Sequence, residues 1–163
     1  MTKVRAPLFP LYSDVRRLLI ILEGVSKATV TSTIRSIQAQ TGTPQNPVDW
    51  TDPDTWIPDR LSGADEEFAL RIWRESQHTI NPRHIYGAYL FINDHGLLTA
   101  DVNGIYRLAE RGQAFLDDED SVVREIDDAE GLPQLLGILS TKTRAMRGDL
   151  VPEWGEFLRE YSN

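Results

Sequence analysis

Residues 96–116 read GLLTADVNGIYRLAERGQAFL and combine a hairpin with a helix that follows it directly. The short segments LLTA and IYRL alternate around the turn DVNG, whose Asn-Gly pair is typical of a tight hairpin. The segment LAERGQAFLDD then predicts a helix that packs on the body of the protein through Leu108, Phe115 and Leu116. We therefore expect one hairpin at about residues 98–108, closed by a helix.

Two amphipathic helices with a short turn between them are predicted near the N-terminus. Residues 13–23 start at Ser13, a favourable N-cap, and stop before Gly24. Residues 28–40 carry Val30, Ile34 and Ile37 on one side. Their other side presents Thr31, Ser32, Arg35 and Ser36. This order is the outline of a helix-turn-helix, which also arises by chance in helical proteins.

Residues 41–63 interrupt the helical pattern. Four prolines, Pro44, Pro47, Pro53 and Pro58, predict a long loop here. Trp50 and Trp56 are too apolar for a free linker, so we expect them to anchor the loop on the core. An aromatic clamp on a flipped DNA base is the alternative role for these two side chains.

Two further helices lead into the hairpin. Residues 64–76 place acidic side chains in the first helical turn and apolar ones inward. The next helix starts at Asn81, an N-cap followed by Pro82, and ends at Gly96. Its first turn contains Arg83 and His84.

Composition and charge describe an ordinary globular protein with an uneven charge distribution. The net charge is −8, but residues 1–42 hold six basic and two acidic residues, a net charge of +4, which leaves −12 on the rest. A basic third on an acidic body is suited to contact DNA on one face, although a local excess of this size also arises by accident. No apolar run approaches the roughly 18 residues of a membrane span. The lack of a leader and of any cysteine predicts a cytoplasmic location.

The order of these elements predicts a mainly α fold with a small β-hairpin wing, a winged helix-turn-helix, over residues 1–117. The string at 96–116 resembles the wing signature of prokaryotic winged helices. After the acidic segment DDEDS, helices at 122–128, 132–139 and 152–161 are expected to begin a second winged-helix-like domain at 118–163.

Several segments also resemble one family of proteins from about Pro10 onward. They are DWTDPDTWIPDRLSG (49–63), ALRIWRES (69–76), NPRHIYGAYLFINDHGLL (81–98) and EGLPQLLGILSTKTRAMRGDLVPEWGEFLREYSN (130–163). They are similar to the N-terminal region of restriction endonuclease-like proteins of the Mrr type. The resemblance implies that the winged helices recognise DNA, often modified DNA, while a separate C-terminal nuclease domain of the parent protein cuts it.

The motifs of common enzymes are missing from the sequence. An Mrr-type nuclease site needs an Asp and a Glu-x-Lys pair that hold a divalent metal, and no Glu stands two positions before Lys3, Lys27 or Lys142. There is no cysteine, and the three histidines lack the spacing of a zinc site. Phosphate-binding loops of the G-x-x-x-x-G-K-[ST] and G-x-G-x-x-G types and a G-x-S-x-G elbow are also missing. We therefore expect a binding protein with no metal, no cofactor and no enzymatic activity.

Two helices compete as the DNA-reading element. In a winged helix the recognition helix precedes the wing, which favours Arg83 and His84 as contacts to phosphate or a base edge, with Gly87 permitting close approach. The other interpretation has Arg83 paired with an acid and His84 capping the core. The rival reading element is the basic second helix with Thr31, Ser32, Arg35 and Ser36.

The predicted wing carries charged residues that affect DNA binding, and several binding partners are expected. The wing offers Arg107 as a phosphate ligand, whereas Asp101 at its tip would repel a phosphate. The expected partners are double-stranded DNA, modified or not, the C-terminal nuclease domain of the parent protein, and a second copy of the chain. The alternative function is a winged-helix protein-interaction or dimerisation module that does not bind DNA.

Overall fold

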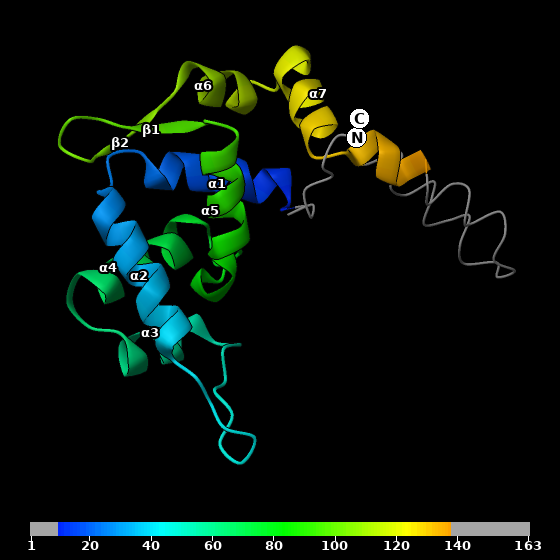
Figure 1. Ribbon diagram of the computed structural model, residues 1–163. Coiled ribbons are helices and arrows are strands. Elements are labelled where there is room, and N and C mark those ends of the chain that lie inside the picture. Colours follow the sequence, from blue (N-terminus) through cyan, green and yellow to red (C-terminus); the bar gives the residue numbers. More distant parts are fainter. Residues whose placement is uncertain (1–9, 138–163) are drawn as a thin grey trace, which may run out of the picture. The chain divides into compact units, whose positions relative to one another are not determined.

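A computed structural model describes residues 10–137 of the 163-residue chain (Figure 1). It is mainly helical and contains one two-stranded antiparallel sheet, which confirms the fold class at this level. The elements in chain order are α1 (Tyr12–Leu22), α2 (Lys27–Ala39), α3 (Pro53–Arg60), α4 (Gly63–Glu75), the 3-10 turn η1 (Pro82–His84), α5 (Ile85–Asp94), β1 (Leu98–Ala100), β2 (Tyr106–Leu108), α6 (Glu110–Leu116) and α7 (Asp120–Ala129).

The chain divides into two compact units. One unit spans Phe9–Asp117 and contains everything from α1 to α6. Residues 118–137, with α7 and a helical segment at 132–137, belong to the other unit. The predicted helix at 152–161 and the end of the one at 132–139 lie outside the described residues. The second winged-helix-like domain therefore stays a prediction.

The first two helices lie close to their predicted positions, with one correction at the start of α1. Leu11, and not Ser13, is the N-cap, and its carbonyl oxygen accepts from the N–H groups of Asp14 and Val15 at 3.0 Å each. Ser26 caps α2, because its hydroxyl oxygen accepts from the N–H of Ala28 at 3.2 Å. The cap places Lys27 at the first position of α2.

The segment 41–63 is not a continuous loop, because α3 forms within it. Asp52 caps this helix by accepting from the N–H of Asp54 at 3.2 Å, and Pro53 occupies the first position, where no amide donor is needed. Pro58 lies inside the helix. Burial of Trp56 and Ile57, which are 2% and 0% exposed, offsets the backbone hydrogen bond that Pro58 removes.

The helix before the hairpin begins as predicted but in a tighter form. The Asn81 side chain accepts from the N–H of Arg83 at 3.0 Å, and η1 then continues into α5. Helix α4 runs from Gly63 to Glu75 against a prediction of 64–76. Both helices pack on the N-terminal pair, α4 against α2 and α5 against α1.

The predicted hairpin is confirmed, and it is joined to a third extended segment. Leu98 pairs with Leu108 and Ala100 with Tyr106. The segment between α1 and α2 then runs along β2. Its backbone hydrogen bonds are Gly24 N–H to Tyr106 O (2.8 Å), Tyr106 N–H to Val25 O (2.9 Å) and Lys27 N–H to Gly104 O (2.8 Å). The hairpin turn is thereby held beside the start of α2.

One part of the core of the first unit lies between α1, α5 and α6. Tyr12 contacts the rings of Phe91 and Phe115 with centroids 5.6 and 5.3 Å away. Gly112 in α6 lies so close to β1 that an added Cβ would stand 2.0 Å from the carbonyl oxygen of Leu97. The glycine of the segment LAERGQAFL is therefore required by this close approach.

Within residues 10–137, a membrane span would need a longer apolar helix than any that the chain forms.

Candidate nucleic-acid interface

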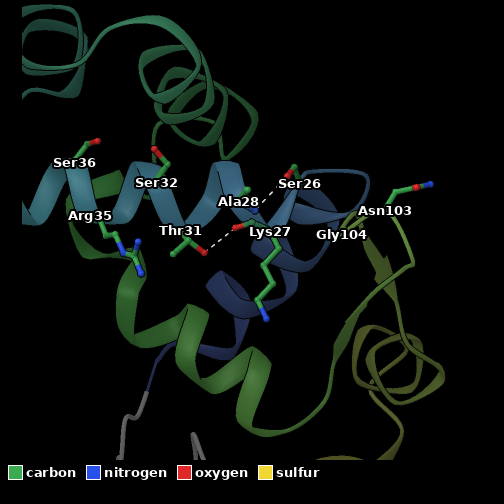
Figure 2. A pocket seen from close by; sticks show the side chains of 9 residues that line it. All are labelled: Ser26, Lys27, Ala28, Thr31, Ser32, Arg35, Ser36, Asn103 and Gly104. Atoms are coloured by element: carbon green, nitrogen blue, oxygen red, sulfur yellow. Dashed lines mark hydrogen bonds between the residues drawn. The ribbon is translucent and has the colours of Figure 1, made fainter.

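A groove follows the exposed side of α2 and ends at the hairpin turn (Figure 2). Its volume is about 620 Å³. The lining residues are Ser26, Lys27, Ala28, Thr31, Ser32, Arg35 and Ser36 from α2 and its cap, with Asn103 and Gly104 from the turn. We call this feature the α2 groove. It brings together Thr31, Ser32, Arg35 and Ser36 of the predicted site and adds Lys27 and the hairpin turn.

The two cations of the α2 groove are available to a ligand. The side chains of Lys27, Thr31 and Arg35 extend from the same side of α2 (Figure 2). Lys27 and Arg35 are exposed, and no carboxylate of residues 10–137 pairs with either of them. Thr31 donates its hydroxyl hydrogen to the carbonyl oxygen of Lys27 at 2.7 Å, so its oxygen can still accept. This side of the helix therefore presents two unpaired positive charges and a hydroxyl.

The serines of α2 have a structural role, because they hold α2 to α4. Ser32, Thr33 and Ser36 all donate to the Asp65 carboxylate, at 3.3, 2.9 and 2.6 Å. Burial acts to raise the pKa of Asp65, but the hydrogen bonds from Ser36, Thr33 and Ser32 outweigh it and lower the pKa below its usual value. The hydroxyl hydrogens of Ser32 and Ser36 are thus already used. Of the four polar α2 residues predicted as DNA contacts, Arg35 alone keeps its donors unused among the described residues, since the Thr31 hydroxyl hydrogen is also donated, to the Lys27 carbonyl oxygen.

The hairpin turn is built around Asp101. Its carboxylate accepts from the N–H groups of Asn103 and Ile105 at 2.9 and 3.0 Å and from Arg107 Nε at 3.1 Å. The hydrogen bond from the Ile105 N–H lowers the pKa of Asp101, burial opposes this, and Asn103 and Arg107 lower it further. Arg107, predicted as a phosphate ligand, therefore forms an ion pair that neutralises the acid expected to repel DNA.

Arg83 and His84, at the start of α5, lie outside the α2 groove. The Arg83 guanidinium carbon stands 4.7 Å from the centroid of the Trp50 ring. No acid of the described residues pairs with Arg83, so the ion pair of the alternative interpretation does not form. His84 is exposed and does not cap the core. Gly87 has open space where a Cβ would stand, which leaves room for a close approach from outside.

The tryptophans anchor the segment between α2 and α4, as the sequence favoured. Trp56 is 2% exposed and packs in a core cluster with Ile37, Ile57, Leu61 and Ala69. The clamp role is wrong for Trp56, because a buried ring offers no face to a base. Trp50 is half-buried, with its ring centroid 5.0 Å from that of Trp56 at an angle of 76°.

Lys27 and the hairpin turn are the parts of the α2 groove that sequence reasoning missed. The predicted helix started at Ala28, which left Lys27 in the preceding turn. A signal was present in the sequence, since Ser26 is a favourable cap that places Lys27 on the helix. The sequence places Asn103 and Gly104 in the hairpin turn, but nothing local predicts that this turn meets α2.

Comparison with models of known protein families, with curated proteins and with solved structures finds no match.

Proposed function

We propose that this chain binds double-stranded DNA as a winged helix, with the α2 groove as the contact surface and the hairpin as the wing. The single observation that carries the proposal is the pair of unpartnered cations, Lys27 and Arg35, on one side of a helix whose start is fixed beside the wing turn. Phosphate neutralisation by such cations supplies most of the general affinity for DNA.

The dimensions of the site suit a DNA groove. Lys27 and Arg35 are eight residues apart, which corresponds to about 12 Å along a helix, close to the width of the major groove. Asn103 lies in the turn at the end of the same groove, where its side-chain amide can both donate and accept hydrogen bonds. The acidic remainder of the chain disfavours indiscriminate binding.

The biological role that we propose is recognition for a restriction system of the Mrr type. Its support is the resemblance of segments 49–63, 69–76, 81–98 and 130–163 to that family. In this role the chain reads modified DNA and a separate nuclease domain cuts it. Competition between methylated, hydroxymethylated and unmodified duplexes of one sequence tests this role, and equal affinity for all three contradicts it.

The DNA-binding proposal is tested by the salt dependence of duplex binding. Fluorescence anisotropy with a labelled duplex is measured across a salt series for the wild type, Lys27→Gln and Arg35→Gln. Each variant is expected to reduce the slope of log K against log salt by about one unit if its cation contacts one phosphate. Arg74→Gln on α4 is the control, because it removes the same charge from an exposed arginine outside the α2 groove.

Two results contradict the proposal. The first is an equal change of slope in Arg74→Gln and in the groove variants, which shows a net-charge effect. The second is the lack of any duplex binding by the wild type at low salt. Dimerisation in sedimentation, lost in Arg35→Gln, would then favour the protein-interaction function instead.

A further inference from the structure

A second cationic feature lies past the C-terminal end of α2, where Trp50 carries two arginines over its ring. The guanidinium carbons of Arg83 and Arg60 stand 4.7 and 5.8 Å from the ring centroid. They come from different elements, η1 and α3. A cavity of about 370 Å³ opens beside Trp50 and Arg83, with Gln40, Thr41 and Thr43 among the residues that line it. We call this feature the Arg83 pocket.

The Trp50 ring is a fixed platform for these arginines. The Asn81 side chain donates to the Trp50 carbonyl oxygen at 2.6 Å, and the ring packs against the core cluster of Trp56. An arginine stacked on an aromatic ring keeps its N–H donors at the edge of the guanidinium, where they remain open to a ligand. Less side-chain entropy is then lost when an anion binds than for a free arginine.

No ion pair uses the guanidinium N–H donors of Arg60 and Arg83 among the described residues. Across residues 10–137, neither Arg60 nor Arg83 has a carboxylate within ion-pair distance. Two acids nearby in sequence are engaged elsewhere. Asp49 accepts from the hydroxyl and the N–H of Thr51 at 2.6 and 2.9 Å, and Asp54 accepts from the indole N–H of Trp73 at 3.1 Å.

We infer that the Arg83 pocket binds a phosphate group, with Arg83 as the principal donor and Arg60, which contacts the same ring but does not line the cavity, as a more distant cation. Guanidinium groups match the geometry of phosphate oxygens, and the threonine hydroxyls and the Gln40 amide supply further donors at the cavity wall. The phosphate belongs to the backbone of the duplex held in the α2 groove. A smaller cavity of about 140 Å³ between α2 and α5 shares Arg83 with the Arg83 pocket and is also lined by Ile34 and Gln38 of α2. This choice of source rests on the proposed function, whereas the phosphate site itself does not.

Two measurements test the inference and distinguish a phosphate of the DNA backbone from a free phosphate or nucleotide. In the first, inorganic phosphate replaces chloride at constant ionic strength, and the indole N–H signals of ¹⁵N-labelled protein are followed by NMR. A saturable shift of the Trp50 signal is expected for the wild type and for Arg74→Gln. It should be lost in Arg83→Gln and weakened in Arg60→Gln. Arg83→Lys, which keeps the charge, shows whether a loss in Arg83→Gln comes from misfolding, because it should retain part of the shift.

In the second measurement, the slope of log K for duplex binding against log salt is compared among the same variants. Arg83→Gln and Arg60→Gln should each reduce the slope by about one unit, in addition to the losses from Lys27→Gln and Arg35→Gln. A phosphate shift with an unchanged slope supports the site but assigns it to a free phosphate or nucleotide. A phosphate shift in a protein that binds no duplex contradicts the proposed function and leaves the site standing. Lack of a saturable shift in the wild type, or an equal shift in Arg83→Gln, overturns the inference.

Discussion

The backbone N–H of Lys27, the first residue of α2, donates to the carbonyl oxygen of Gly104 in the hairpin turn at 2.8 Å. Seventy-seven positions separate these residues in the sequence, yet they form adjoining walls of the α2 groove. The bond belongs to a ladder in which β2 also pairs with Gly24 and Val25. The position of the hairpin relative to α2 is therefore set by the main chain.

Gly104→Ala should weaken this arrangement. Gly104 has a φ of +75°, and a Cβ there would meet no atom within 4 Å, so backbone conformation alone determines the effect. A left-handed conformation costs an ordinary residue about 1–2 kcal/mol, and we expect the free energy of unfolding to fall by about 1 kcal/mol. Chemical denaturation measures this change. Faster hydrogen exchange at the Lys27 N–H than in the wild type should accompany it, whereas unchanged exchange would show that the turn adapts without strain.

Gly87→Ala should have the opposite effect on stability. Gly87 lies in α5 with open space around its Cβ position, and alanine is favoured over glycine inside a helix by up to about 1 kcal/mol. Duplex affinity should stay unchanged, because Gly87 is outside the α2 groove. A large loss of duplex affinity with raised stability would instead show that DNA approaches α5 closely, as expected if the helix before the hairpin is the recognition helix.

Gly112→Ala should be the most damaging of the glycine variants. The new Cβ would stand 2.0 Å from the Leu97 carbonyl oxygen and 3.0 Å from its carbon, both backbone atoms. Relief requires α6 to move away from Leu97, which directly precedes β1, and we expect a loss near the upper end of the about 1–3 kcal/mol that overpacking costs. Thermal unfolding by circular dichroism gives the measurement. A loss below about 1 kcal/mol would mean that α6 moves freely and does not close the hairpin.

Asp65→Asn should reduce stability at neutral pH and flatten its dependence on acid. Three hydroxyl groups donate to this carboxylate, whereas asparagine offers one acceptor oxygen and an NH2 donor, so the three cannot all be satisfied, at an expected cost of about 2 kcal/mol. The pKa of Asp65 in the folded protein is lowered, so the stabilisation is complete above the unfolded pKa of about 4 and disappears as the pH falls through the folded value. Urea denaturation at a series of pH values from about 6 to 2 follows this loss.

Glu66→Gln is the matched control for Asp65→Asn. Glu66 also lies in the first turn of α4, so the control removes a neighbouring charge at the same end of the helix. Its side chain is not the acceptor for Ser32, Thr33 or Ser36, which all donate to Asp65. If Glu66→Gln lowers stability and alters its pH dependence as much as Asp65→Asn, the effect comes from the helix dipole and not from the link to α2.

Local signals predicted most of the helices and the hairpin, because caps, periodicity and an Asn-Gly turn act over a few residues. The same logic should have revealed α3, since Asp52-Pro53 is a start signal of the kind that Asn81-Pro82 provided. It was hidden by Pro58, whose cost is offset by the burial of Trp56. A sequence window does not show that tertiary packing compensates for one unfavourable residue.

The candidate site was less predictable, because its geometry depends on long-range pairs. Helical periodicity predicts that Thr31, Ser32, Arg35 and Ser36 lie away from the core. It does not predict that Ser32 and Ser36 bind Asp65, because that contact depends on α4. Likewise, Arg83 meets Trp50 rather than an acid because the segment before α3 folds back on η1. Neither relationship leaves a periodic pattern in the sequence.

Backbone hydrogen bonds between β2 and the start of α2 determine the shape of the α2 groove, whereas its side chains determine which ligand it can bind. These hydrogen bonds join peptide groups, so exchanging the side chains of Lys27 or Asn103 leaves the spacing of the two walls unchanged. Thr31 and Arg35 project from a helix that is secured on its opposite side through Asp65. New combinations of residues at these four positions can therefore be screened for altered ligand preference on an unaltered framework, which makes this protein a practical starting point for engineered recognition.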